Sequence, residues 1–127
     1  MIVKILLVLA GLMGAAGMVL AAAAAHAAPG ASLDSAAYML LFHAIAVIAG
    51  VALLQRGLLW RPLFLLVLAA WVLGAALFAG DLAMRAFASH RLFPYAAPSG
   101  GTILIAAWVT FAGAAICALF RKSGVQS

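Results

Sequence analysis

The sequence predicts an all-α membrane protein, a four-helix antiparallel transmembrane bundle with both termini in the cytoplasm. Three observations carry this prediction. The chain of 127 residues is 70% hydrophobic and 7% charged, whereas soluble domains carry roughly a quarter charged residues. Four apolar segments of about twenty residues fill most of its length, and each can cross a hydrocarbon core of roughly 30 Å. Five of the seven lysine and arginine residues fall on one side of these segments.

A single transmembrane domain is expected over residues 1–127, with helices at about 3–27, 36–55, 62–87 and 102–120. Proline and glycine interrupt helical hydrogen bonding, so Pro29-Gly30 ends the first helix. Pro62 fits the first turn of the third helix, where its missing N–H costs nothing. Pro98, Gly100 and Gly101 predict a shaped loop before the fourth helix.

A secretory signal peptide is the alternative interpretation of the first segment. Lys4 precedes the apolar run, and Ala25-His26-Ala27 resembles a small-x-small cleavage site. The apolar run from Ile5 to Ala25 is, however, longer than the usual signal core of about 7–15 residues. A retained transmembrane helix is therefore favoured.

Small residues on the first helix predict a packing face. Gly14, Gly17 and Ala21 recur at three- and four-residue steps, which places them on one side of a helix. In lipid, small residues allow two helices to approach closely, since no hydrophobic force drives helices together there. The alternative is an alanine-rich helix without a particular partner.

The basic residues predict the orientation. The cytoplasmic side holds Lys4, Arg56, Arg61, Arg121 and Lys122; the other side holds Arg85 and Arg91 together with both acids, Asp34 and Asp81. The positive-inside rule places both termini and the middle connection in the cytoplasm, with the bundle in a bacterial inner membrane or an equivalent bilayer.

Charge and cysteine content exclude several classes of function. The net charge is +5, but no basic run exceeds the pair Arg121-Lys122, so nucleic acid is not an expected partner. Cys117 is alone, which excludes an internal disulfide and a cysteine-rich metal site. It is expected to fill space in the packed interior, as free cysteines usually do.

The candidate site is a polar pocket in the outer half of the bundle, which is the half away from the cytoplasm. It is formed by His26, Tyr38, His43 and Asp81. A polar side chain as deep as His43 is expected to face the bundle interior or a cavity. Imidazole is the commonest side-chain ligand of metals and haem. The two histidines are expected at depths that differ by more than one helical turn, so no metal or cofactor is assigned.

Three activities remain to be weighed. Transport needs polar residues through the midplane, and the first, third and fourth helices show none there. Catalysis needs a nucleophile or an acid–base pair; His43 with Asp81 is the one candidate pair, and no catalytic residue is assigned. The favoured function is structural or accessory: a bundle in the lipid bilayer that packs with itself or with a larger membrane complex. A small transporter or channel, and a metal- or haem-binding protein, are the alternatives.

Several short motifs occur in order along the chain. They are Ala21–Ala28 with His26, Phe42-His43-Ala44-Ile45-Ala46, Leu77-Phe78-Ala79-Gly80-Asp81-Leu82, and Ala97-Pro98-Ser99-Gly100-Gly101 followed by Trp108. In this order the chain resembles the small four-helix membrane-protein family catalogued as domain of unknown function 423, which includes transmembrane protein 256. The resemblance implies the four-helix fold and no established activity. The chain departs from the family pattern at Asp81, where a serine is usual, and at Ala21 and Ala24, where glycines are common.

Overall fold

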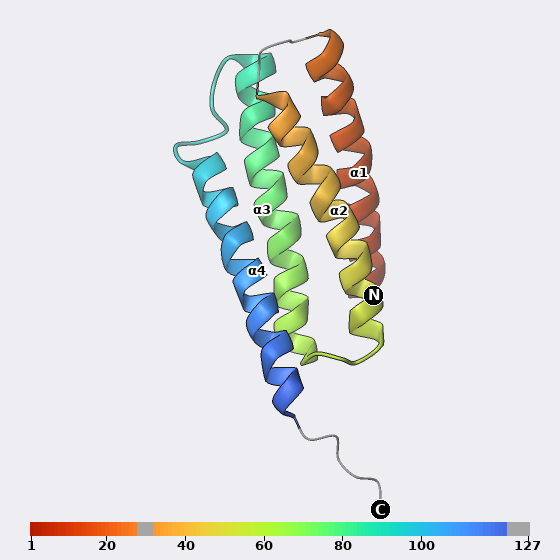
Figure 1. The fold of residues 1–127 in the computed structure, drawn as a ribbon. Helices are drawn as coiled ribbons and strands as arrows, with labels where there is room; N and C mark the ends of the chain where they lie inside the picture. Colours follow the sequence, from red (N-terminus) through yellow and green to blue (C-terminus); the bar gives the residue numbers. More distant parts are fainter. Residues whose placement is uncertain (28–31, 122–127) are drawn as a thin grey trace, which may run out of the picture.

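The computed structural model describes residues 1–27 and 32–121 and contains four helices in an antiparallel arrangement (Figure 1). Their bounds are α1 Ile2–His26, α2 Leu33–Gln55, α3 Arg61–Ala88 and α4 Ala96–Phe120. Each is long and apolar enough to cross a membrane, with a mean hydropathy of 2.3 to 2.5 over its most apolar part. The predicted all-α, four-helix fold is confirmed, and the chain has the architecture of a multi-pass membrane protein. Pro29-Gly30 and Lys122 lie outside the described residues.

The helices lie in the order α1, α2, α3, α4 across the molecule, and α2 and α3 form its centre (Figure 1). Helix α1 packs along α2, and α4 packs along α3. Among the described residues, α1 meets α3 at few points and does not reach α4. The bundle is therefore open on the side between α1 and α3. The start of α1 and the end of α4 lie toward the same end of the molecule.

The prediction of a loop at Pro98, Gly100 and Gly101 is wrong, because these residues lie in the first two turns of α4. The first four N–H groups of a helix have no partner within that helix, so Pro98 costs no hydrogen bond at this position. The irregular connection is instead residues 89–95. It is bounded by two non-glycine residues in the left-handed region, Ser89 with φ 58° and Tyr95 with φ 66°.

Glycines set the distance between neighbouring helices at several points. At Gly17 on α1, a methyl group in place of the hydrogen would lie 2.8 Å from Cγ of Leu41 on α2. Gly14 and Ala21, the other two residues of the predicted packing face, are only half-buried, and a methyl group at Gly14 would meet nothing within 4 Å. Gly17 thus makes the close approach between α1 and α2.

Among the described glycines, the closest approach to a facing backbone joins α3 to α4. A methyl group at Gly100 would lie 2.6 Å from the carbonyl oxygen of Gly74 and 2.7 Å from the backbone nitrogen of Phe78. Gly100, one of the residues that suggested a loop, therefore lets the two helix backbones meet.

Candidate functional site: a histidine–tryptophan pair between α2 and α4

His43 is a buried polar residue near the middle of α2, roughly 15 Å from the helix start at Leu33 by the rise of 1.5 Å per residue. Its Nδ1 lies 2.8 Å from the carbonyl oxygen of Met39, one turn earlier. Its Nε2 lies 3.2 Å from Nε1 of Trp108 on α4. An indole N–H can only donate, so Nε2 must accept and the ring proton sits on Nδ1, where it donates to Met39.

This geometry engages both nitrogens of the His43 ring. A metal ion could bind Nε2 only by displacing the Trp108 N–H. In the part of the chain that the structure describes, no three His, Cys, Asp or Glu side chains come together as a set of metal ligands. The arrangement suits a hydrogen bond that joins α2 to α4 in an apolar environment, where an unpaired imidazole would be costly.

His43 of α2 lies at the edge of an aromatic cluster that α3 and α4 form together. The ring centroids of Trp71 and Trp108 are 4.4 Å apart, and Phe111 lies 5.7 Å from Trp71 and 6.0 Å from Trp108. Phe64 stacks on Phe111 at 5.6 Å. Nε1 of Trp71 is buried without a hydrogen-bond partner among the described residues. The sequence contained a signal for this cluster: Trp71 and Trp108 lie in mid-segment, whereas membrane tryptophans usually lie at the interface.

Asp81 occupies a second buried polar position, at the corner between α3 and α4. Its carboxylate pairs with Arg85 one turn later and accepts a hydrogen bond from the backbone N–H of Leu92 at 2.9 Å. The backbone N–H of Ala97, in the first turn of α4, also faces this carboxylate. The residue before α4, Tyr95, makes no side-chain cap. Asp81, which belongs to α3, therefore places a negative charge near the N-terminus of α4, where the helix dipole favours one.

The four residues of the predicted polar pocket have separate surroundings. His26 is exposed at the end of α1, and Tyr38 is 59% exposed with its ring 6.2 Å from that of Phe42. His43 faces α4, and Asp81 faces the 89–95 connection. Four cavities in the described part of the chain are lined by other residues. Of the predicted set, His43 and Asp81 are buried, each with partners of its own.

We expect His43 and Trp108 to be coupled energetically. In a double-mutant cycle with His43→Ala and Trp108→Phe, the coupling free energy should be about 1 kcal/mol, since hydrogen bonds between membrane helices are worth roughly 0.6 to 1.7 kcal/mol. Unfolding in mixed detergent micelles, followed by circular dichroism, measures it. The control is a second cycle of His43→Ala with Trp60→Phe. Trp60 is exposed and lies outside the cluster, so this cycle should give no coupling. Equal coupling in both cycles would contradict the hydrogen bond.

A comparison with models of protein families finds a match that covers most of the chain. The family model described as "Protein of unknown function (DUF423)" matches residues 13–101. This range contains His43, Asp81 and the contacts of Gly17, Gly74 and Gly100, and it ends within the second turn of α4. No curated protein and no solved structure matches the chain.

Proposed function

Because the chain belongs to the DUF423 family, whose function is unknown, we propose a function from the arrangement of its helices. The protein is a structural or accessory component of a membrane, which packs through its exposed helix faces with a second copy of itself or with a larger membrane complex. No catalytic residue and no cofactor is part of this proposal.

A groove on the open side of the bundle is the observation that carries the proposal. It has a volume of about 500 Å3 and lies between α1 and α3, with Leu40 of α2 also lining it. All of its lining residues are apolar side chains or glycine: Leu9, Leu12, Met13, Ala16, Val19, Leu20, Leu40, Val72, Ala76, Ala79, Gly80 and Ala83. Its chemistry therefore favours another apolar helix over a polar ligand.

The α3 wall of the groove has the spacing of a helix-packing motif. Ala76 and Gly80 are four residues apart, and so are Ala79 and Ala83, so each pair lies on one face of α3. Small residues at this spacing promote close helix pairing in lipid. Helix α3 uses Gly74 internally, against Gly100 of α4. The groove residues form a second small-residue face. Its Ala79 is buried but its Ala76 is exposed, so the described helices cover this face only in part.

A bulky residue in the groove should weaken this association. We expect Ala16→Trp to reduce the bound partner about tenfold, because forcing extra atoms into a packed contact costs roughly 1–3 kcal/mol. Cross-linking in native membranes, followed by gentle extraction and mass spectrometry, measures the partner and its amount. Ala15→Trp is the matched control, since Ala15 is a neighbouring exposed residue of α1 that does not line the groove. A wild-type protein without any partner, or equal effects of both variants, would contradict the proposal.

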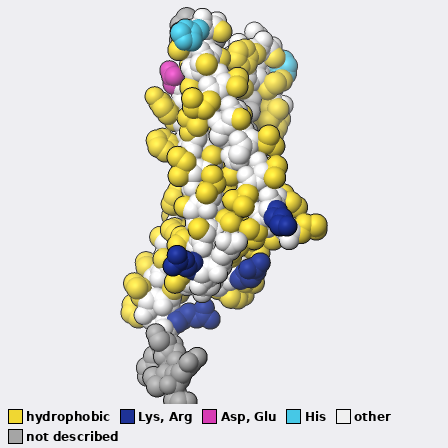
Figure 2. All heavy atoms as spheres, turned by 90° about the vertical axis from the view of Figure 1, so that its right-hand side faces the viewer, with side chains coloured by type: hydrophobic (Ala, Val, Ile, Leu, Met, Phe, Trp, Pro, Cys, Tyr) yellow, Lys and Arg dark blue, Asp and Glu magenta, His cyan; other side chains and the backbone are white. Residues whose placement is uncertain are grey.

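The proposed location is the bacterial inner membrane, with both termini in the cytoplasm. Basic side chains gather at one end of the bundle (Figure 2), where α1 begins, α2 ends, α3 begins and α4 ends. They include Lys4, Arg56, Arg61 and Arg121, whereas both acidic side chains belong to the start of α2 and the last part of α3, at the opposite end. The positive-inside rule supports a cytoplasmic location for the basic end.

Reporter fusions test this orientation. Fusions at Arg56 and after the C-terminus should report cytoplasm, and a fusion at Arg91 in the 89–95 connection should report the opposite side. N-terminal sequencing of the mature protein tests whether α1 is retained; a chain that starts near Ala27 would support the signal-peptide alternative. The continuous packing of α1 on α2 supports retention. An external signal at Arg56 or at the C-terminus would overturn the proposed orientation.

A further inference from the structure

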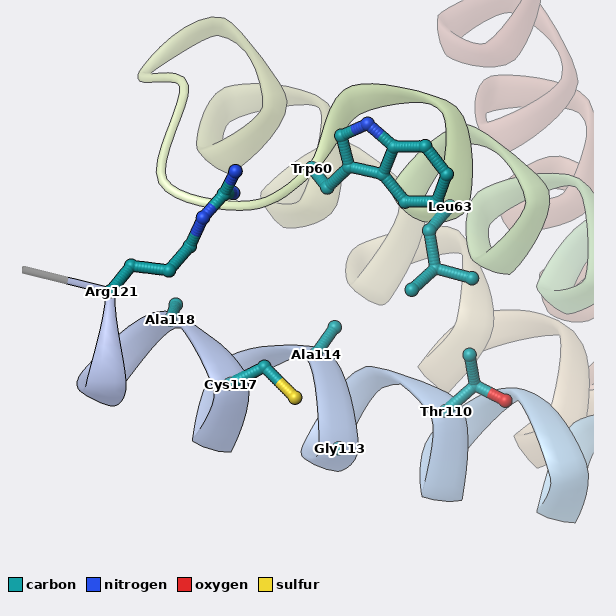
Figure 3. A pocket seen from close by; sticks show the side chains of 8 residues that line it. All are labelled: Trp60, Leu63, Thr110, Gly113, Ala114, Cys117, Ala118 and Arg121. Atoms are coloured by element: carbon teal, nitrogen blue, oxygen red, sulfur yellow. The ribbon is translucent and has the colours of Figure 1, made fainter.

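A cavity of about 540 Å3 opens between the start of α3 and the last three turns of α4 (Figure 3). Trp60 and Leu63 line it from the α3 side, and Gly113, Ala114, Cys117 and Arg121 from the α4 side. Cys117 was expected in the packed interior; it is exposed instead and faces this cavity. The small residues of α4 make the space, because no long side chain of that helix fills it.

The cavity has the depth of one membrane leaflet. Its lining on α4 extends from Thr110 to Arg121, three turns apart or roughly 16 Å along the helix axis. This is about half of the roughly 30 Å hydrocarbon thickness of a bilayer. The hydroxyl of Thr110 donates to the carbonyl oxygen of Ala106 in its own helix, so it offers no free donor to the cavity. The floor is apolar, and its length suits an acyl chain.

The cavity is basic where it reaches the basic end of the bundle. Arg121 extends from α4 toward the connection between α2 and α3, and the indole of Trp60 lies across the opening (Figure 3). Among the described residues, no hydrogen bond or ion pair engages the Arg121 guanidinium. The other basic side chains of this end, Lys4, Arg56 and Arg61, add to the positive potential, and neither Asp34 nor Asp81 is near enough to offset it.

We propose that this cavity is a binding site for an anionic phospholipid, with one acyl chain along α4 and the phosphate held by Arg121. A guanidinium binds phosphate oxygens through paired N–H donors, and basic pockets between transmembrane helices are typical sites for anionic head groups. A tryptophan at the rim suits the level of the head groups. The site is separate from the α1–α3 groove, and the proposal does not depend on the proposed association.

Lipid retention measured by native mass spectrometry tests the proposal. The purified protein is offered equal amounts of phosphatidylglycerol and phosphatidylcholine in mild detergent. The wild type should retain phosphatidylglycerol about fivefold more than phosphatidylcholine, which corresponds to about 1 kcal/mol for one basic residue near the anionic lipid. Arg121→Gln should abolish this preference. Gly113→Leu should lower the retention of both lipids, since the new side chain fills the cavity, and nothing lies within 4 Å to clash with its Cβ.

Two control variants test whether the effects on lipid retention are specific to the cavity. Lys4→Gln removes a charge at the same end outside the cavity lining, and Gly11→Leu adds the same side chain at another open position, on α1. Both should retain lipid as the wild type does. Equal retention of the two lipids by the wild type, or an unchanged preference in Arg121→Gln, would overturn the proposal. Competition by millimolar inorganic phosphate alone would also overturn it, because it would indicate a simple anion site.

Discussion

Replacing Gly100 by alanine is expected to lower the free energy of unfolding by about 2–3 kcal/mol and to separate α4 from α3. The added methyl group would lie 2.6 Å from the carbonyl oxygen of Gly74 and 2.7 Å from the backbone nitrogen of Phe78. Both are backbone atoms of α3, so no side-chain rotation can make room. The helices must move apart, and overpacking of this kind typically costs about 1–3 kcal/mol, occasionally more.

Gly101→Ala is the matched control for this result. A methyl group there would lie 3.9 Å from Cδ2 of Phe78, which is an ordinary van der Waals contact. Both glycines lie in the second turn of α4, so both variants gain the same helix propensity, at most about 1 kcal/mol. Gly101→Ala should therefore be neutral or slightly stabilising. Chemical unfolding in bicelles, followed by circular dichroism, measures both. Equal destabilisation by the two variants would contradict the close contact at Gly100.

The two glycines also show which part of the fold the sequence could predict. The number and type of the segments follow from local hydropathy, because each helix must satisfy its own backbone hydrogen bonds in lipid. The role of a Gly-Gly pair after a proline does not follow locally, because the same residues suit a loop and a close helix contact. The presence of Gly74 on the facing helix decides between them, and only the pairing of α3 with α4 reveals it.

For the candidate site, too, the sequence could predict local features but not which helices pair. The depth of His43 on its helix predicted a side chain directed into the bundle, and the structure has it buried there. Its partner Trp108 is 65 residues away in the sequence, and the rotation and pairing of the helices bring the two together. Asp81 and Arg85 are four residues apart, a spacing that favours an ion pair on a helix, but the burial of the carboxylate depends on how residues 89–95 fold back over it.

The two buried polar side chains of the described residues, His43 and Asp81, join separate elements rather than form an open pocket. His43 connects α2 to α4, and Asp81 connects α3 to the 89–95 connection and the start of α4. Such contacts give the bundle a defined arrangement in a solvent where hydrophobic burial supplies little preference. The surfaces with room for a partner are instead the α1–α3 groove and the cavity near Arg121. The polar contacts thus hold the bundle together, while the groove and the cavity are left for partners, which supports a role in assembly with other membrane components.

Removal of the Asp81 carboxylate is expected to be the most damaging change at a polar side chain of this bundle. Asp81→Ala leaves the N–H of Leu92 without its acceptor, removes the negative charge at the start of α4 and leaves Arg85 unpaired. We expect the melting temperature to fall by about 5 °C or more. Asp81→Asn keeps an oxygen that can accept from Leu92 and should lose less.

Arg85→Gln separates the ion pair from the backbone contacts of Asp81. The side chain of Arg85 is 38% accessible, whereas that of Asp81 is buried. In Arg85→Gln the carboxylate keeps its hydrogen bond from the backbone N–H of Leu92, so we expect a smaller loss of stability than in Asp81→Ala. The expected order of destabilisation is therefore Asp81→Ala, then Asp81→Asn, then Arg85→Gln, measured as melting temperatures in the same bicelles. Hydrogen exchange should show the same order at the amide of Leu92, because its protection depends on the acceptor oxygen. An effect of Arg85→Gln as large as that of Asp81→Ala would mean that the ion pair, and not the hydrogen bond from Leu92, stabilises the connection between α3 and α4.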